Sequence, residues 1–341
     1  MFEVSKVRRK RARRSRDRVC AVDDSTVTKI SVTSFASKCA KVVVYQPKCS
    51  VDRSCSCFIL LTRPTQLALF GRAKVMHLCG PSIHILGGTM EPNLSTSFNV
   101  FSSTSHTPIS IKQSDDAAKE NAATRLLSLE VKLAVESLCE PGDACSIIES
   151  LVAELDSFQN SASVLHFSPF SNRVLDSVTE VKRFRFLFHL PSEGTVPGIS
   201  LAHSLGFNFL EHDGSLGYQV VPEISNISVR FGSISVDKSY KRHVNKILIC
   251  GPKGAGKSSL LRFLSNTILT DTSCPSEERR VAILDCDVGQ PEFTPSGMIS
   301  LSLLRQPLFG PPFTHLFSAD MDIIRQCFVG SISPSDDPNF T

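Results

Sequence analysis

Residues 251–258, GPKGAGKS, fit the phosphate-binding pattern G-x-x-x-x-G-K-[ST] at every fixed position. Glycines allow backbone N–H groups to fold around phosphate oxygens, and the N-terminus of a following helix adds positive partial charge. In this pattern Lys257 reaches the β- and γ-phosphates of a nucleoside triphosphate, and the Ser258 hydroxyl is a ligand of Mg²⁺. The alternative is a glycine-rich turn that binds nothing. We predict that the triphosphate site is formed by Gly251, Pro252, Lys253, Gly254, Ala255, Gly256, Lys257, Ser258 and Ser259.

Two carboxylates follow the loop, in the segment 281–290, VAILDCDVGQ. Four apolar residues and then an acid are typical of a buried parallel strand that delivers a carboxylate at its C-terminal edge, where open α/β sheets bind ligands. Asp285 and Asp287 are two residues apart, so in an extended chain both side chains leave the strand on the same side. One then holds Mg²⁺ and the other accepts a proton from an attacking hydroxyl. The alternative for Asp287 is a turn residue ahead of Gly289.

The elements around these motifs predict how they are positioned. The apolar run 247–250 has the length of a buried strand, and apolar residues after the loop recur at helical spacing. No N-K-x-D guanine-binding motif follows, so ATP is the expected nucleotide. Residues 243–341 are predicted to form an α/β P-loop NTPase domain whose parallel sheet is incomplete at its C-terminal end. Further short strands are expected at 299–304, 314–317 and 323–329.

The part of the chain before the loop, 25–221, has the pattern of a mainly β domain. Short β-prone runs are cut by glycines at Gly71 and by Gly-Pro and Gly-Gly pairs further on. This spacing predicts an antiparallel sandwich or small barrel, a kind of domain that usually serves packing or interaction. The runs are 41–45, 58–61, 66–70, 73–79, 83–86, 97–101, 109–111, 164–167, 184–190 and 216–221.

A helical insertion into this β domain is predicted at about 115–158. Leucines and valines over 126–138 form a helical stripe, which Asp115 or Asp116 would cap at its N-terminus and Pro141-Gly142 would end. A second helix is expected at 147–158. The pair would pack on the β domain, and residues 222–242 would link that domain to the phosphate-binding one.

Basic and aromatic residues alternate in the segment 182–186, KRFRF. Such alternation suits a surface that binds RNA. It also suits an amphipathic strand that turns Phe184, Phe186 and Phe188 toward a core, which is the interpretation that the pattern favours.

The charge of the chain is concentrated at its N-terminus. The formal net charge is +4, and 9 of the 37 basic residues lie in the first 18. Residues 1–24 are therefore expected to be a disordered basic tail, which serves as a nuclear or nucleolar import signal, as an arm for RNA phosphates, or only for solvation. The 12 scattered cysteines suit reduced thiols rather than a metal site at Cys55-Ser56-Cys57. Without a long apolar run, no membrane association is expected.

Two segments together carry a family resemblance: GPKGAGKSS at 251–259 and LDCDVGQPEFTPSG at 284–297. They resemble the polynucleotide 5'-hydroxyl kinases of the nucleolar, ribosomal-RNA-processing family, to which the pre-mRNA cleavage-complex RNA kinase is closely related. Segments 306–315 and 328–334 are similar to the nucleolar branch as well. A looser likeness covers 69–101.

The resemblance implies transfer of the ATP γ-phosphoryl group to the 5'-hydroxyl of RNA during ribosomal RNA processing, in the nucleus and its nucleolus. It implies that Lys257 and Ser258 hold the triphosphate and Mg²⁺, that Asp287 is the base with Asp285 on the metal side or the reverse, and that Gln290 lies near the transferred phosphate. RNA with a 5'-hydroxyl end and other RNA-processing proteins are the implied partners.

One departure from the family pattern concerns length. Family members continue into a lid with arginines and a further domain, whereas this sequence stops at Thr341, so a truncated chain is expected. Two other functions stay open at this point. The first is an ATP-binding assembly factor that changes partner affinity, and the second is a non-catalytic RNA-processing scaffold.

Overall fold

The computed structural model describes most of the chain outside its N-terminus and a long central segment. The described residues are 29–34, 40–46, 56–106, 108–114, 122–140, 142–159, 161–188, 207–212, 246–272, 279–315, 321–333 and 335. The basic tail of 1–24 and the linker of 222–242 lie outside these ranges and stay predictions. No helix within the described ranges is both long and apolar enough to cross a bilayer.

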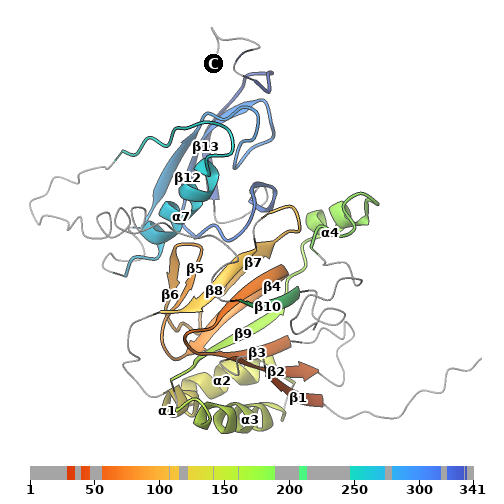
Figure 1. The fold of residues 1–341 in the computed structure, drawn as a ribbon, viewed down its shortest axis with the longest axis vertical. Coiled ribbons are helices and arrows are strands. Elements are labelled where there is room, and N and C mark those ends of the chain that lie inside the picture. The colour runs from red at the N-terminus through yellow and green to blue at the C-terminus, as the bar shows by residue number, and fades with distance from the viewer. Residues whose placement is uncertain are drawn as a thin grey trace, which may run out of the picture.

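A ten-stranded sheet forms the larger part of the fold (Figure 1), and every described strand pair in it is antiparallel. Its main path runs β1-β2-β3-β9-β4-β8-β5-β6, with β7 and β10 also paired to β4. The strands are β1 Lys29–Ser34, β2 Ala40–Gln46, β3 Ser56–Leu61, β4 Gln66–Cys79, β5 Ile83–Ile85, β6 Gly88–Met90, β7 Phe98–Ser102, β8 Ile109–Gln113, β9 Ser163–Pro169 and β10 Phe207–His212.

Strand β4 joins two runs that the sequence pattern separates at Gly71. The chain passes through Gly71 with a φ of 109°, and this residue still pairs with Ser102 on β7 and Phe207 on β10. A glycine tolerates this φ without a steric penalty, so it bends the strand and does not end it. β4 can therefore curve far enough to pair with four other strands.

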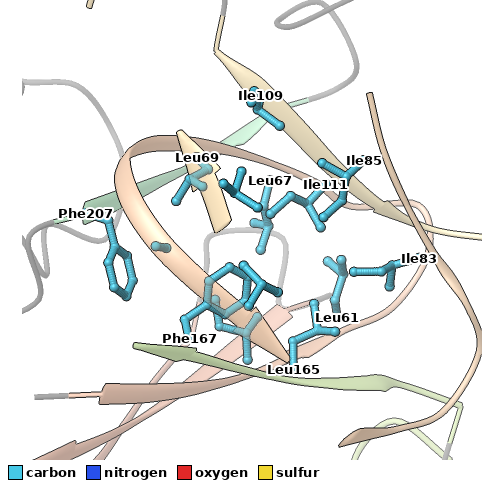
Figure 2. Packing of buried hydrophobic residues seen from close by; sticks show 14 of the residues in the cluster. Leu61, Leu67, Leu69, Ile83, Ile85, Ile109, Ile111, Leu165, Phe167 and Phe207 are labelled. Atoms are coloured by element: carbon cyan, nitrogen blue, oxygen red, sulfur yellow. The ribbon is translucent and has the colours of Figure 1, made fainter. Parts of the chain in front are cut away.

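Both faces of the sheet are covered, so β3 is buried along its whole length. Cys57, Ile59 and Leu61 face one hydrophobic cluster, which also takes side chains from β4, β5, β8 and β9. Figure 2 shows these side chains gathered inside the curve of β4. Phe58 and Leu60 face a second cluster on the opposite side. Because successive side chains of β3 point to opposite faces of the sheet, they pack alternately into the two clusters.

The second cluster is covered by three helices, α1 Ala122–Leu126, α2 Leu129–Leu138 and α3 Ala144–Asp156. The predicted stripe over 126–138 is split between α1 and α2 because Ser128 caps α2, accepting a hydrogen bond from Val131 N at 3.4 Å. Leu129 and Leu133 of the stripe are exposed. The proposed caps Asp115 and Asp116 lie outside the described residues.

The expected strand at 184–190 is wrong for its described part. Helix α4 (Arg173–Glu180) precedes it, capped by Asn172, and residues 181–188 follow as successive turns. In these turns Phe184 N donates to Val181 O at 2.8 Å and Leu187 N donates to Phe184 O at 2.9 Å. An alternating pattern becomes a strand only when a neighbouring strand accepts its hydrogen bonds, and none of the described strands pairs with this segment.

The C-terminal part contains helix α7 and a three-stranded sheet of order β11-β12-β13. Its elements are α7 Lys257–Leu269, β11 Val281–Asp285, β12 Met298–Leu304, the 3₁₀ helix η2 Pro312–Thr314 and β13 Met321–Phe328. The helix after the loop and the strands near 299 and 323 are confirmed. The 314–317 strand is wrong for Thr314, which belongs to η2.

The predicted parallel sheet is also corrected. Both described pairings, β11 with β12 and β12 with β13, are antiparallel. Residues 247–250 form no strand, and Leu248 is 87% exposed. In β11 only Ile283 is buried, while Leu284 is 67% exposed. A parallel strand needs hydrogen-bonded neighbours and cover on both faces, and the described residues supply neither for the run 247–250.

Candidate nucleotide-binding cleft

The phosphate-binding loop leads directly into α7, whose first residue is Lys257. Gly254 and Gly256 have φ values of 79° and 83°, which L side chains rarely adopt. An added Cβ at either position would meet nothing within 4 Å, so backbone conformation and not space requires glycine here. The loop is exposed, and Lys257 Nζ donates to Pro252 O at 3.1 Å, which folds the ammonium group back over the loop.

A cleft of about 890 Å³ opens beside the start of α7. One wall is Ser258, Ser259 and Arg262 of α7, and another is the segment after β11 that includes Gly289 and Gln290. The third wall comes from the β domain and from the region of η2: Thr104, Ser105, His106, Pro312 and Phe313. The last residues of the loop motif and the end of the acidic motif therefore line one cleft, together with residues of the β domain that no sequence motif predicted.

The cleft does not take in every predicted residue. Ser258, Ser259 and Gln290 line it, whereas the loop residues 251–257, Lys257 included, and the carboxylates Asp285 and Asp287 are not among its lining residues. Arg262, His106 and Phe313 line it without having been predicted. Of these three residues, only Arg262 could have been found from the sequence, because it lies one helical turn after Ser258.

Asp285 is held by the backbone that follows it. Its Oδ1 accepts from Asp287 N at 3.0 Å, and its Oδ2 accepts from Glu292 N at 2.6 Å. Burial raises the pKa of Asp285 above its usual value, and the nearby carboxylates of Glu292 and Asp287 act in the same direction against the two N–H donors. Its protonation is thus easier than that of an exposed aspartate.

Asp287 is exposed and organises the turn toward the cleft. Its Oδ1 accepts from Gly289 N at 3.1 Å and from Gln290 N at 3.0 Å. Such contacts are typical of an aspartate that stabilises a turn, which was the alternative role for Asp287. Because Gly289 and Gln290 line the cleft, the Asp287 carboxylate contacts that wall through these two N–H groups, and its role as base or metal ligand stays a prediction.

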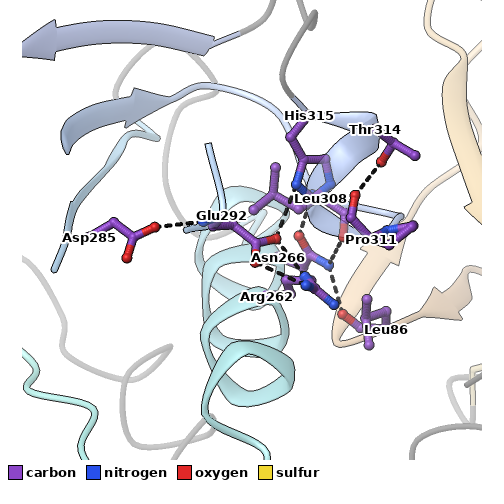
Figure 3. Close-up of polar contacts among 9 residues, drawn as sticks. All are labelled: Leu86, Arg262, Asn266, Asp285, Glu292, Leu308, Pro311, Thr314 and His315. Carbon is purple, nitrogen blue, oxygen red and sulfur yellow. Dashed lines mark hydrogen bonds and ion pairs between the residues drawn. The ribbon is translucent and has the colours of Figure 1, made fainter. Parts of the chain in front are cut away.

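A buried ion pair ties α7 to the segment after β11 (Figure 3). Arg262 Nε and Nη2 donate to Glu292 Oε1 and Oε2 at 2.6 and 2.9 Å. Both side chains are almost fully buried, and His315 Nδ1 lies 3.1 Å from Glu292 Oε1. Burial alone would raise the pKa of Glu292, but His315 and Arg262 outweigh it and lower the pKa.

The fully buried side chain of Asn266 joins α7 to the β domain. Its Nδ2 donates to Leu86 O at 2.9 Å and to Leu308 O at 3.0 Å, and its Oδ1 accepts from Leu308 N at 2.6 Å. Next to it, Gly87 approaches α7 so closely that an added Cβ would lie 2.6 Å from Phe263 O. These contacts fix α7, and with it the loop, against the turn between β5 and β6.

Within the described ranges, no group of three or more His, Cys, Asp or Glu side chains could hold an ion. The free cysteines described are Cys57, Cys79, Cys139, Cys145, Cys250, Cys286 and Cys327. Ser258 and an aspartate remain a chemically suitable set for Mg²⁺, because this ion takes few protein ligands and completes its shell with phosphate and water.

Two family models match the chain. Residues 251–341 match the P-loop of the mRNA cleavage and polyadenylation factor CLP1, and residues 45–204 match the N-terminal domain of the polynucleotide 5'-hydroxyl-kinase NOL9. Both parts of the fold described above thus have counterparts in known domain families.

Curated relatives agree. The polynucleotide 5'-hydroxyl-kinase grc3 of Aspergillus fumigatus is 48% identical over 101 residues, which are 28% of this chain and 12% of the relative. That of Aspergillus niger is 39% identical over 136 residues, 31% of this chain and 16% of the relative. The polynucleotide 5'-hydroxyl-kinase GRC3 of Gibberella zeae is 42% identical over 106 residues, which are 30% of this chain and 15% of the relative. The matched stretch is thus a small part of each relative, and two separate parts of the chain are similar to the CLP1 P-loop family and to the N-terminal domain of the polynucleotide 5'-hydroxyl-kinase NOL9.

Proposed function

We propose that this chain is an ATP-dependent polynucleotide 5'-hydroxyl kinase, which transfers the γ-phosphoryl group of ATP to the 5'-hydroxyl of RNA in ribosomal RNA processing. The observation that carries the proposal is the cleft: the N-terminus of α7, where phosphates bind, and the turn that Asp287 organises line the same cavity. The relatives' names support the reaction class.

The residues have separate roles in this proposal. Lys257 and the loop N–H groups hold the β- and γ-phosphates, and Ser258 and Asp285 would hold Mg²⁺, which supplies charge neutralisation for the transferred group. Asp287, which is exposed and bonded to the lining residues Gly289 and Gln290, is the group that would orient the 5'-hydroxyl and take its proton. Gln290 faces the cleft, where it can contact the transferred phosphate.

The β domain has a part in the same site. Thr104, Ser105 and His106 line the same cleft as Ser258 and Gln290. Ser103 and Ser105 hydroxyls lie 2.9 and 3.0 Å from His106 Nδ1, and burial lowers the pKa of this histidine, which favours its neutral form. A neutral, oriented imidazole suits a contact with the nucleotide or the RNA end.

The test is transfer of label from γ-labelled ATP to an oligoribonucleotide with a 5'-hydroxyl. The parent chain is expected to label this oligoribonucleotide, and Lys257→Ala is expected to abolish labelling. Lys246→Ala, which changes an exposed lysine before the loop, is expected to leave labelling unchanged. An oligonucleotide that already carries a 5'-phosphate is the substrate control. Hydrolysis of ATP without labelled RNA would overturn the kinase proposal in favour of an ATP-binding assembly factor.

Localisation and partners follow as part of the proposal. The nine cations among the first 18 residues support import into the nucleus and its nucleolus, where other RNA-processing proteins would be partners. A fluorescent fusion of the chain, compared with one that lacks residues 1–18, tests this. Equal nuclear signal from both fusions would contradict the assignment to the tail.

A further inference from the structure

The turn segment 181–186 after α4 is exposed along its whole length within the described structure. It carries the cations Lys182, Arg183 and Arg185 and no acid. Between them the rings of Phe184 and Phe186 are 47% and 54% exposed. Exposed phenylalanines interleaved with cations form a surface that is both apolar and positive, which a merely solvated turn does not need.

The same segment is anchored to the rim of the cleft. Thr104, which lines the cleft, donates from its N to Leu187 O at 2.8 Å and from its Oγ1 to Phe186 O at 3.1 Å. Phe188 is buried, and its ring centroid lies 6.1 Å from that of Phe313, another lining residue. The segment that carries the exposed rings of Phe184 and Phe186 is therefore bonded directly to residues that line the cleft.

Packing of the buried Phe188 holds the C-terminal end of this segment in place. The Arg72 guanidinium lies 5.0 Å from the ring centroid of Phe188 and pairs with Asp176 of α4 at 2.6 Å. On the outer side, the Arg185 guanidinium lies 5.3 Å from the ring centroid of Phe186. A cation held next to an open ring face can contact a phosphate while the neighbouring ring stacks on a base.

We propose that residues 181–186 bind single-stranded RNA and guide its 5' end into the cleft; the second half of this statement rests on the proposed kinase function. A polyanion satisfies the three cations, and unpaired bases offer faces for the two rings. A duplex hides its base faces within the stack, so it would use only the cations.

The test measures binding without ATP, so that it does not depend on turnover. A fluorescein-labelled, 5'-hydroxyl oligouridine is titrated with the full chain, and fluorescence anisotropy is recorded at several salt concentrations. Phe184→Ala/Phe186→Ala is expected to weaken binding by about tenfold or more, since each stacked base contributes roughly five- to a hundredfold. Lys182→Gln/Arg183→Gln is expected to reduce the slope of log affinity against log salt by about 1.4.

Matched controls use exposed residues elsewhere. Phe328→Ala removes a 71% exposed ring from β13, and Lys112→Gln/Lys132→Gln removes two exposed cations from β8 and α2. Both are expected to bind RNA like the parent, and unchanged melting temperatures show that all variants fold.

The outcomes separate this proposal from the kinase proposal. The RNA surface is overturned if Phe184→Ala/Phe186→Ala binds RNA like the parent, or if Phe328→Ala loses as much RNA affinity as that variant does. Either result counts against the surface even if label transfer succeeds. Ring-dependent RNA binding without label transfer sustains the surface and sinks the kinase proposal. A parent chain that binds no oligouridine overturns the surface and leaves a protein as the occupant of the segment.

Discussion

Arg262 and Glu292, 30 residues apart in the sequence, form a two-point ion pair with N···O distances of 2.6 and 2.9 Å in a site where both side chains are almost fully buried. Glu292 N in turn donates to Asp285 Oδ2 at 2.6 Å. The helix behind the phosphate-binding loop is thereby connected to the end of the acidic strand. The relative position of the two motifs depends on this connection.

Glu292→Ala is expected to lower the free energy of unfolding by about 3–5 kcal/mol, because it removes the carboxylate that forms the two-point ion pair with the buried Arg262 guanidinium. Urea unfolding at neutral pH measures the change. The matched control is Asp322→Ala, which breaks the pair with Arg305 whose side chains are 53% and 56% exposed. That change is expected to cost less than about 1 kcal/mol. Equal costs for the two variants would contradict the structural role of the buried pair.

Asn266→Ala is expected to destabilise the contact between α7 and the β domain by about 3 kcal/mol. It removes three hydrogen bonds and leaves buried groups of Leu86 and Leu308 without a partner. Asn93→Ala serves as the control, since Asn93 Oδ1 accepts from Ser95 N and Thr96 N at an exposed turn and should matter by about 1 kcal/mol or less. Hydrogen exchange of α7 amides should rise only in the Asn266 variant.

Gly256→Ala is expected to weaken ATP binding by at least about tenfold. The φ of 83° at this position strains an alanine by roughly 1–2 kcal/mol, and relief of that strain would reorient the loop N–H groups. Gly142→Ala is a close match, with a φ of 95° and nothing within 4 Å of an added Cβ. Gly142→Ala should lower the free energy of unfolding as much as Gly256→Ala does. It should leave the ATP affinity, measured by calorimetry, unchanged. Loss of affinity in both variants would point to general destabilisation.

Stability is expected to fall as the pH decreases from about 6.5 to 4. Burial, with a smaller effect of Lys74, lowers the pKa of His166 to about 4, and burial lowers that of His77 to about 4. The unfolded chain therefore takes up protons in this window while the folded protein does not. His166→Phe should reduce the pH slope of the unfolding free energy. Phe58→Leu, which changes the ring packed against His166, removes no titrating group and should keep that slope.

The β domain was predictable where local pattern and packing agree. Strands β3 and β9 are apolar runs of strand length, and both lie where the pattern placed them because β3 is buried throughout and β9 over its first five residues. The expected strand at 184–190 had an equally clear alternation. It became turns because that pattern says nothing about whether a neighbouring strand is available.

The sequence by itself determined the phosphate-binding loop and the helix behind it, because glycine torsions, a lysine and a helical stripe are local properties of 251–269. Only the tertiary structure decided what packs against that helix and which residues line the cleft beside it. The contacts of Asn266 with Leu86 and of Thr104 with Leu187 join residues 180 and 83 positions apart, and such pairs leave no periodic signal. Side chains so distant in the chain meet only because the two sheets and α7 pack together, and it is that packing which gives the cleft its third wall and its aromatic rim.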